Sequence, residues 1–249
     1  MSDETSLGHY PATPRWEFDA EVTRVFEDML RRSIPQLDVM RGIVVDLAER
    51  YREPLTPIVD LGASRGDAVA PMVERGWATP FHLVEVSAPM ADVCRARFAP
   101  YIGLPPDRGR MSPSVEVHET DLRVGYPDVG TASVTLAVLA LQFTPIQHRQ
   151  RILRDVYRST MPGGAMILVE KVLGSDAEAD DALVSLYHDM KERNGYTREE
   201  IDRKAASLEG VLVPVTARWN EELLRAAGFR TVECVWRCLS FAAWLAVRS

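Results

Sequence analysis

Two carboxylates and a glycine-rich turn are the residues best suited to chemistry in this sequence. A short apolar run leads into a turn that contains Asp60, Gly62 and Gly66, and about twenty residues later a second apolar run ends at Glu85. Glycine lets a backbone approach a ligand closely, and an acidic residue at the end of the next strand can accept hydrogen bonds from ribose hydroxyls. The pattern therefore predicts a nucleoside-binding crevice in an open α/β sheet.

The spacing of the turn narrows the kind of nucleoside. Gly62-x-x-x-Gly66 lacks the G-x-G-x-x-G arrangement that cradles a dinucleotide pyrophosphate. It fits S-adenosylmethionine, which has no pyrophosphate. We therefore expect this cofactor to bind at the turn.

The elements that must position the turn alternate between strands and helices. This order predicts a mostly parallel sheet with helices on both faces. The expected strands are Ile58–Leu61, His82–Val86, Ser114–His118, Ala132–Phe143, Ala165–Glu170, Thr231–Arg237 and Ser240–Val247. The expected helices are Phe18–Arg32, Val39–Arg52, Ala68–Arg75, one capped by Ser87, His148–Arg158, one or two within Asp180–Leu208, and Glu221–Ala227 capped by Asn220 and stopped by Gly228. A turn is expected at Met161–Gly164.

The chain is predicted to hold one domain. Residues 1–16 are polar and proline-punctuated and are expected to form a mobile lead-in, with the α/β domain over residues 17–249. A helical insertion at about residues 174–215 exceeds what the basic fold needs, so it is a candidate lid or dimer arm.

Composition excludes several classes of protein. The net charge of −7 offers no overall attraction to nucleic acid, and no apolar run has the length of a membrane span. With no signal-like N-terminus, a cytoplasmic location is expected. Three cysteines with no C-x-x-C pair predict neither a disulfide framework nor a zinc site, and Cys234 and Cys238 are expected in the core. The five histidines show no clustering with one another or with carboxylates along the sequence, so no metal is expected.

The motifs resemble those of a known family. Asp60-Leu61-Gly62, Glu85, Asp121 and Pro162-Gly163-Gly164 together resemble the class I methyltransferases, with a seven-stranded mixed sheet in the order 3-2-1-4-5-7-6. Further motifs over residues 17 to 247 resemble the carboxy-S-adenosylmethionine synthase family. They are Phe18-Asp19, Val25-Phe26-x-Asp28-Met29, Arg32-Ser33-x-Pro35, Leu141-Gln142-Phe143, His188-Asp189-x-Lys191, Asn194-Gly195-Tyr196 and Leu208-Glu209-x-Val211.

The resemblance implies a function and a set of cofactor contacts. That family uses prephenate to convert the cofactor's methyl group to a carboxymethyl group for tRNA wobble-uridine modification, and it works as a homodimer. Its cofactor contacts fall here on Gly62, Ala63, Ser64, Glu85, Val86, Asp121 and Leu122. With Asp60 and with Gln142 at the carboxyl end of the fourth strand, these are the expected cofactor-binding residues.

Three family contacts are absent from this sequence. A family tyrosine is Leu37 here, an asparagine is Val138, and the arginine that binds the extra carboxylate, supplied across the dimer, is Ala205. A carboxylate in an apolar crevice needs a charge-assisted partner, and losing it costs roughly 2–5 kcal/mol. We therefore expect a relative that kept ordinary S-adenosylmethionine and transfers methyl to a small-molecule acceptor, as in secondary metabolism. The insertion is expected to build the acceptor pocket and a homodimer contact.

The residues that face the acceptor are less defined by the sequence. His188 and Tyr196, on the insertion, are the candidates, although His188 could equally be structural. Asp189 and Lys191 fit a solvated helical pair, and the arginines of His148–Arg158, Arg149 included, fit a solvated face.

Three alternatives stay open. Carboxy-S-adenosylmethionine synthesis could persist if Arg203 or Lys204 replaced the missing arginine. C-methylation of a 2-oxo acid would need Arg193, Arg203 or Arg218 to anchor the acceptor carboxylate. The third alternative is a non-catalytic S-adenosylmethionine-binding partner protein.

Overall fold

The computed structural model describes residues 16–104 and 112–249 of the chain. Most of the expected lead-in, residues 1–15, lies outside this range. Trp16 already belongs to the domain, because its side chain is buried and its backbone N–H donates to the Ser207 carbonyl at 2.9 Å.

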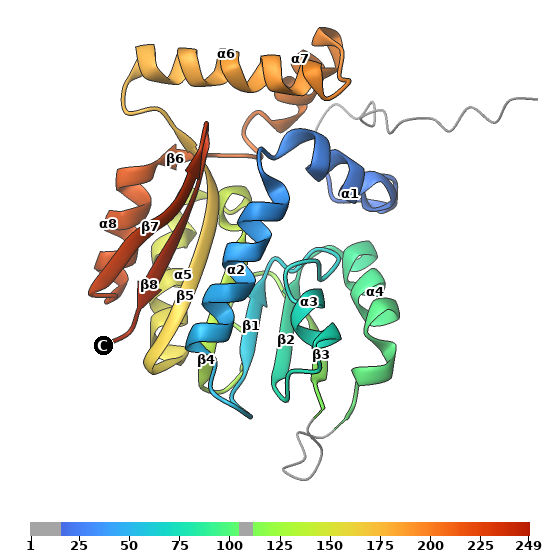
Figure 1. The fold of residues 1–249 in the computed structure, drawn as a ribbon, viewed down its shortest axis with the longest axis vertical. Helices are drawn as coiled ribbons and strands as arrows, with labels where there is room; N and C mark the ends of the chain where they lie inside the picture. The colour runs from blue at the N-terminus through green and yellow to red at the C-terminus, as the bar shows by residue number, and fades with distance from the viewer. Residues whose placement is uncertain (1–15, 105–111) are drawn as a thin grey trace, which may run out of the picture.

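A mixed sheet forms the centre of the molecule (Figure 1). In the described residues it has eight strands, in the order β3-β2-β1-β4-β5-β8-β7, with β6 paired to the end of β5. The strands are β1 (Ile58–Leu61), β2 (Pro80–Glu85), β3 (Ser114–Glu119), β4 (Ala132–Val138), β5 (Thr160–Leu173), β6 (Val215–Thr216), β7 (Thr231–Cys238) and β8 (Phe241–Val247). With the two-residue β6 set aside, this is the predicted order 3-2-1-4-5-7-6, and the predicted fold class is confirmed.

Helices cover both faces of the sheet, as predicted. The helices α2, α3 and α4 pack on one face, and α5 and α8 pack on the other (Figure 1). Both faces are apolar because parallel strands in the middle of such a sheet are buried on each side. The helices are α1 (Ala20–Ser33), α2 (Leu37–Tyr51), α3 (Ala70–Glu74), α4 (Ala88–Arg97), α5 (Ile146–Ser159), α6 (Ala177–Arg193), α7 (Arg198–Leu208) and α8 (Ala217–Ala227), with short 3-10 turns η1 (Ala99–Tyr101) and η2 (Leu141–Phe143).

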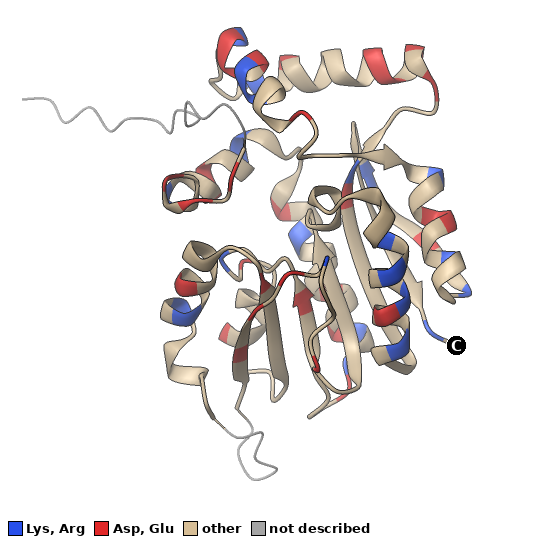
Figure 2. Ribbon diagram, turned by 180° about the vertical axis from the view of Figure 1, so that it is seen from behind, with Lys and Arg blue, Asp and Glu red and all other residues tan. Residues whose placement is uncertain are grey.

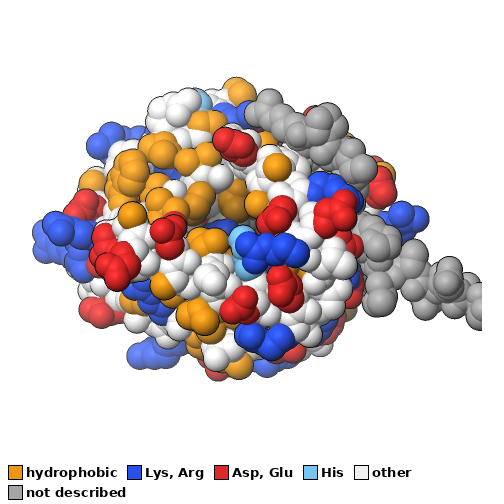
Figure 3. All heavy atoms as spheres, turned by 90° about the horizontal axis from the view of Figure 1, so that it is seen from above, with side chains coloured by type: hydrophobic (Ala, Val, Ile, Leu, Met, Phe, Trp, Pro, Cys, Tyr) orange, Lys and Arg blue, Asp and Glu red, His pale blue; other side chains and the backbone are white. Residues whose placement is uncertain are grey.

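The insertion covers the end of the sheet at which the parallel strands finish. It forms α6 and α7, which lie with α1 above the strand ends (Figure 1). Seen from this end, hydrophobic side chains are exposed among charged ones (Figure 3). One apolar side chain on α6, Leu186, is 51% exposed.

Several expected boundaries were wrong for local reasons. The fourth strand stops at Val138, because Leu139 takes a left-handed backbone conformation (φ 57°), and Gln142 therefore lies in η2 and not on the strand. The turn expected at Met161–Gly164 is an irregular stretch inside β5, where the register with β4 shifts. Asn220 lies within α8, whose N-cap is Thr216.

Other local signals were read correctly. Ser87 caps α4 by accepting the Met90 N–H at 3.4 Å, and Gly228 ends α8 with φ 126°. The cysteine expectation was wrong for two residues: Cys234 is exposed and Cys238 is half-buried, while Cys94 is buried. Of the helices in residues 16–104 and 112–249, none combines the length and apolar character needed to cross a membrane.

Candidate functional site

The glycine turn sits where two neighbouring parallel strands end. β1 pairs with β2 in parallel register, so the residues after Leu61 meet those after Val84. Gly62 has φ 69°, and its N–H donates to the Val84 carbonyl at 2.8 Å. A Cβ at Gly62 would lie 2.5 Å from the Cβ of Ala140. Only glycine fits this position, both in its backbone conformation and in the space available.

Glu85 is fixed next to this turn by backbone donors. One carboxylate oxygen accepts the Ser64 N–H at 2.7 Å, and the other accepts the N–H groups of Val86 and Ser87, each at 2.8 Å. Burial raises the pKa of Glu85, and the three N–H donors oppose that shift. A carboxylate has about four acceptor sites, so about one is left for a ligand hydroxyl. The carboxylate is thus oriented before any ligand binds.

A second carboxyl group lies deeper in the site. Asp60 is 1% exposed, and among the described residues its Oδ2 atom has no hydrogen-bond partner. Burial, together with the nearby charges of Glu85 and Asp67, raises the pKa of Asp60 to about 7. A buried polar atom of this kind calls for a partner that the protein itself does not supply.

These groups open into a cavity of about 990 Å³. Its lining includes every residue predicted to bind cofactor: Asp60, Gly62, Ala63, Ser64, Glu85, Val86, Asp121, Leu122 and Gln142. The volume is at the upper end of the roughly 300–1,000 Å³ found for ligand pockets, which leaves room for a nucleoside and a small second ligand. The site therefore suits a nucleoside cofactor: Glu85 is held in place, the Gly62 turn lets the backbone come close to a ligand, and Asp60 has an oxygen without a partner.

Two of the predicted cofactor residues already have partners within the chain. Asp121 accepts two hydrogen bonds at 2.9 Å from Nε of Arg123, and this pairing lowers the pKa of Asp121. The side-chain oxygen of Gln142 accepts the backbone N–H of Lys171 at 2.6 Å. Gln142 therefore holds β5 against η2, and a ligand would reach only the remainder of its amide.

The two candidate acceptor-facing residues lie in different places. His188, on α6, lines the cavity, and burial together with the charges of Arg198, Lys191 and Lys171 lowers its pKa. Tyr196 does not line the cavity but is buried beneath Arg32, whose guanidinium carbon lies 3.7 Å from the ring centroid. The sequence could not separate these positions, because it gave no angle between α6 and the turn that follows it.

Three lysines line the cavity, and of these the sequence had singled out only Lys204 as a possible replacement for the missing arginine. They are Lys171, Lys191 and Lys204. Lys191 is 4% exposed, so the expectation of a solvated Asp189–Lys191 pair was wrong for the lysine, although Asp189 is exposed. Burial and the charge of Lys191 lower the pKa of Lys204 to about 6, and its amine lies 2.6 Å from the centroid of the Trp16 ring.

The arginines considered as acceptor anchors lie away from the cavity. Arg203 is half exposed and pairs with Glu199 at 2.8 Å, and Arg218 is exposed and pairs with Glu222 at 2.9 Å. Arg193 is exposed as well. None of the three is among the described lining residues.

The position at which the resemblance placed a family arginine, Ala205, lies on α7. Ala205 follows the buried Lys204 on α7, one turn from Ile201, and it lines the cavity although it is itself exposed, as Arg203 is. At this point α7 contributes a methyl group to the wall.

A buried arginine that donates to backbone carbonyls supports the floor of the site. Basic residues run along α5 (Figure 2), but Arg149 is 2% exposed, so the solvated-face interpretation was wrong for this residue. Its guanidinium donates to the carbonyls of Gln142, at 3.1 Å, and Val213, at 2.6 Å. Burial raises the pKa of the neighbouring Glu170 to about 8, although Arg149 opposes the shift. The loop that carries Gln142 is thereby fixed from below.

The fold and the cavity together define a class I methyltransferase, with a cofactor crevice at the carboxyl ends of β1 and β2. No family model matches the chain. Curated relatives do: the carboxy-S-adenosyl-L-methionine synthase of Klebsiella pneumoniae (strain 342) is 35% identical over 94% of this chain and 92% of its own. The enzyme of the same name from Photobacterium profundum is 33% identical over 93% of this chain and 91% of its own length. The chain belongs to the carboxy-S-adenosyl-L-methionine synthase family.

Solved structures share the fold at lower identity. Human N-acetylserotonin methyltransferase in complex with S-adenosylmethionine has a TM-score of 0.58 at 13% identity, and an O-methyltransferase family protein from Burkholderia thailandensis has a TM-score of 0.58 at 18%. The match covers 92% and 93% of this chain but 55% and 60% of those larger chains. The protein is thus an enzyme of the methyltransferase type with S-adenosylmethionine as its cofactor, as predicted.

Proposed function

We propose that this enzyme binds S-adenosylmethionine and transfers its methyl group to a small-molecule acceptor held beneath α6 and α7. The observation that carries the proposal is Ala205. The family resemblance places at this position an arginine that is supplied across the dimer for a cofactor carboxylate, and the neighbouring Arg203 of this chain turns away to Glu199. Without that guanidinium, a carboxylated cofactor would lose a charge-assisted partner, at a cost of roughly 2–5 kcal/mol.

The chain's own residues divide the work of holding the cofactor. Glu85, oriented by three backbone N–H groups, would accept from a ribose hydroxyl, and the Gly62 turn would let the backbone approach the nucleoside. The bound cofactor supplies an electrophilic methyl group on its sulfonium. Much of the catalysis then consists in holding the acceptor in line with that group.

His188 is the proposed proton acceptor for an acceptor that has a proton to lose. It lines the cavity, and its lowered pKa keeps the imidazole neutral near pH 7, which is the form that can take a proton. Since Tyr196 is buried away from the cavity lining, it is proposed to act only by packing under Arg32.

We further propose a homodimer that buries the outer side of the insertion. The half-exposed Leu186 on α6 and the apolar side chains visible at this end of the molecule support it (Figure 3). Sedimentation at several concentrations, with Leu186→Glu as the test variant, measures it. A wild-type monomer would rule the dimer out.

Carboxy-S-adenosylmethionine synthesis is the second candidate function. Identity of 35% over nearly the full length of a curated synthase supports it, and so does the presence of Lys191 and Lys204 on the cavity wall, where an amine could take the place of the arginine. A non-catalytic binding role is the third candidate. C-methylation of a 2-oxo acid would now require one of these lysines as the anchor.

The first experiment identifies the nucleoside that the purified protein carries. The protein is denatured and the released ligand is analysed by mass spectrometry. S-adenosylmethionine or S-adenosylhomocysteine supports the methyltransferase proposal, and a nucleoside heavier by one carbon dioxide overturns it in favour of the synthase. Incubation with S-adenosylmethionine and prephenate then checks the result, since consumption of prephenate points to the synthase as well. If no acceptor pool gives turnover although the cofactor binds, the non-catalytic role stands.

A further inference from the structure

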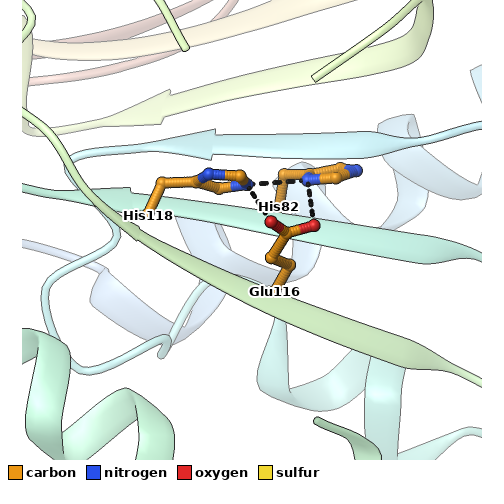
Figure 4. A group of neighbouring side chains, drawn as sticks. All are labelled: His82, Glu116 and His118. Carbon is orange, nitrogen blue, oxygen red and sulfur yellow. Dashed lines mark hydrogen bonds and ion pairs between the residues drawn. The ribbon is translucent and has the colours of Figure 1, made fainter. Parts of the chain in front are cut away.

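A cluster of two histidines and a glutamate lies on the sheet outside the cofactor cavity (Figure 4). It consists of His82 on β2 with Glu116 and His118 on β3, and none of the three lines the cavity. The sequence analysis did not find this cluster, because 34 positions separate His82 from Glu116.

Strand pairing brings the three side chains together. His82 and Glu116 are direct partners in the parallel register of β2 and β3, and His118 lies two residues further along β3. Alternate residues of a strand point to the same face, so all three side chains share one face of the sheet. The cluster is therefore built by two adjacent strands and does not depend on a loop.

The distances between the potential ligand atoms suit one small ion. Nδ1 of His82 lies 2.8 Å from Nε2 of His118, and the Glu116 oxygens lie 3.6 Å and 3.7 Å from these two nitrogens. A tetrahedral zinc ion with Zn–N bonds of about 2.0–2.1 Å holds two nitrogens roughly 3.3 Å apart. The two rings would have to separate by about 0.5 Å, which is within the reach of small side-chain rotations.

Burial and exposure are distributed as a metal site requires. The His82 and His118 side chains are only 15% and 16% exposed, so the strands hold the imidazoles in place, whereas Glu116 is 64% exposed and can swing onto an ion from the solvent side. Two imidazoles and one carboxylate form a donor set used for zinc, with water in the fourth position. Imidazole nitrogen also binds cobalt, nickel and copper ions.

We propose that His82, Glu116 and His118 bind a divalent transition-metal ion, with Zn²⁺ as the favoured occupant, at the β2–β3 edge of the sheet. The ion would link β3, the edge strand, to β2. Since the cluster lies outside the cavity, its role is to stabilise this edge and not to take part in methyl transfer. Without an ion, the two rings share the hydrogen bond at 2.8 Å, and the Glu116 oxygens remain 3.6 Å and 3.7 Å from the ring nitrogens.

The test measures metal binding directly on the full chain. Protein stripped with EDTA is titrated with Co²⁺, followed by the visible d–d bands of tetrahedral cobalt, and with Zn²⁺ by calorimetry. We expect one ion per chain and a higher melting temperature with Zn²⁺. His118→Ala should lose at least 100-fold in affinity and show no zinc-dependent shift, and Glu116→Gln should lose about 10- to 100-fold.

Two controls keep the proposal falsifiable. His148→Ala removes a histidine outside the cluster and should bind Zn²⁺ as the wild type does. Glu116→Gln changes an exposed side chain, so it should fold even if the histidine variant does not. The proposal is overturned if the stripped protein takes up no stoichiometric ion. It is also overturned if both Glu116→Gln and His118→Ala bind Zn²⁺ with wild-type affinity.

Discussion

Replacing Glu85 with glutamine tests the site at its most constrained group. The carboxylate accepts the Ser64 N–H at one oxygen and those of Val86 and Ser87 at the other. Glutamine keeps one acceptor oxygen, which can serve Val86 and Ser87, but its amide nitrogen then faces the Ser64 N–H at 2.7 Å. Two donors cannot satisfy each other, so one buried N–H is left without a partner.

The magnitude follows from that lost bond and the lost charge. A hydrogen bond to a charged group contributes about 1.5–3 kcal/mol. If a ribose hydroxyl donates to the same carboxylate, Glu85→Gln weakens cofactor affinity by about 10- to 100-fold. The folded protein loses a similar free energy of unfolding, which corresponds to a melting temperature lower by about 3–12 °C.

The assay is calorimetric titration of S-adenosylhomocysteine, with melting curves to show that the variant is folded at the working temperature. Glu119→Gln is the matched control, because it makes the same change at the end of the neighbouring strand β3, where Glu119 bonds to Arg95 at 3.3 Å outside the cavity. We expect the control to bind within twofold of the wild type. Wild-type affinity in folded Glu85→Gln would refute the assigned role of this carboxylate.

Three further predictions concern the turn, the buried aspartate and the proton acceptor. Gly62→Ala should destabilise the protein by about 1–3 kcal/mol and abolish cofactor binding, because position 62 has a positive φ and its Cβ would meet Ala140. Gly76 is the control, since it has a φ of 72° but open space around it. In melting experiments Gly76→Ala should show only the cost of placing alanine at a positive φ. Asp60 has a folded-state pKa of about 7, so the fold retains a proton that the unfolded chain releases from about pH 4 upward, and stability falls as pH rises through that window. Asp60→Asn should therefore gain up to about 4 kcal/mol in free energy of unfolding relative to the wild type as the pH rises from 4 to 7, and the difference should level off above pH 7. Chemical denaturation of the cofactor-free protein measures it. A difference that does not depend on pH would contradict the raised pKa of Asp60. For an acceptor that loses a proton, His188→Ala should lower kcat by about 10²- to 10⁴-fold and leave the affinity for S-adenosylhomocysteine unchanged. The acid limb of the wild-type pH–rate profile should lie below about pH 6.5, because the pKa of His188 is lowered. A variant with the same kcat as the wild type would exclude a base role for His188.

The sequence predicted the sheet and the residues that gather around the Gly62 turn because their signals are local. β1 ends at the Asp-x-Gly turn that follows the first apolar run, and β2 ends at the acidic residue that closes the next run. The parallel pairing of these strands then brings Gly62 and Glu85 together. The same reasoning failed at Gln142, because the run after Ala132 stays apolar through the left-handed Leu139 that ends the strand.

Tertiary packing decided the parts that the sequence could not predict. Lys191 and Arg149 look like surface residues by their type and helical spacing, yet both are buried by elements far away in the sequence. Likewise, the histidine–glutamate cluster depends on the register of β2 against β3, which no spacing along the chain reveals.

The segment at the start of the domain has a kinetic consequence. Trp16 bonds to α7 through its backbone, the Phe18 carbonyl accepts the Ser87 hydroxyl at 2.5 Å, and both side chains line the cavity next to α1. A ligand that fills the cavity would therefore pack against two aromatic side chains that the start of the domain supplies. We expect these contacts to slow its dissociation, so the nucleoside should leave the protein faster once Trp16 is replaced by alanine.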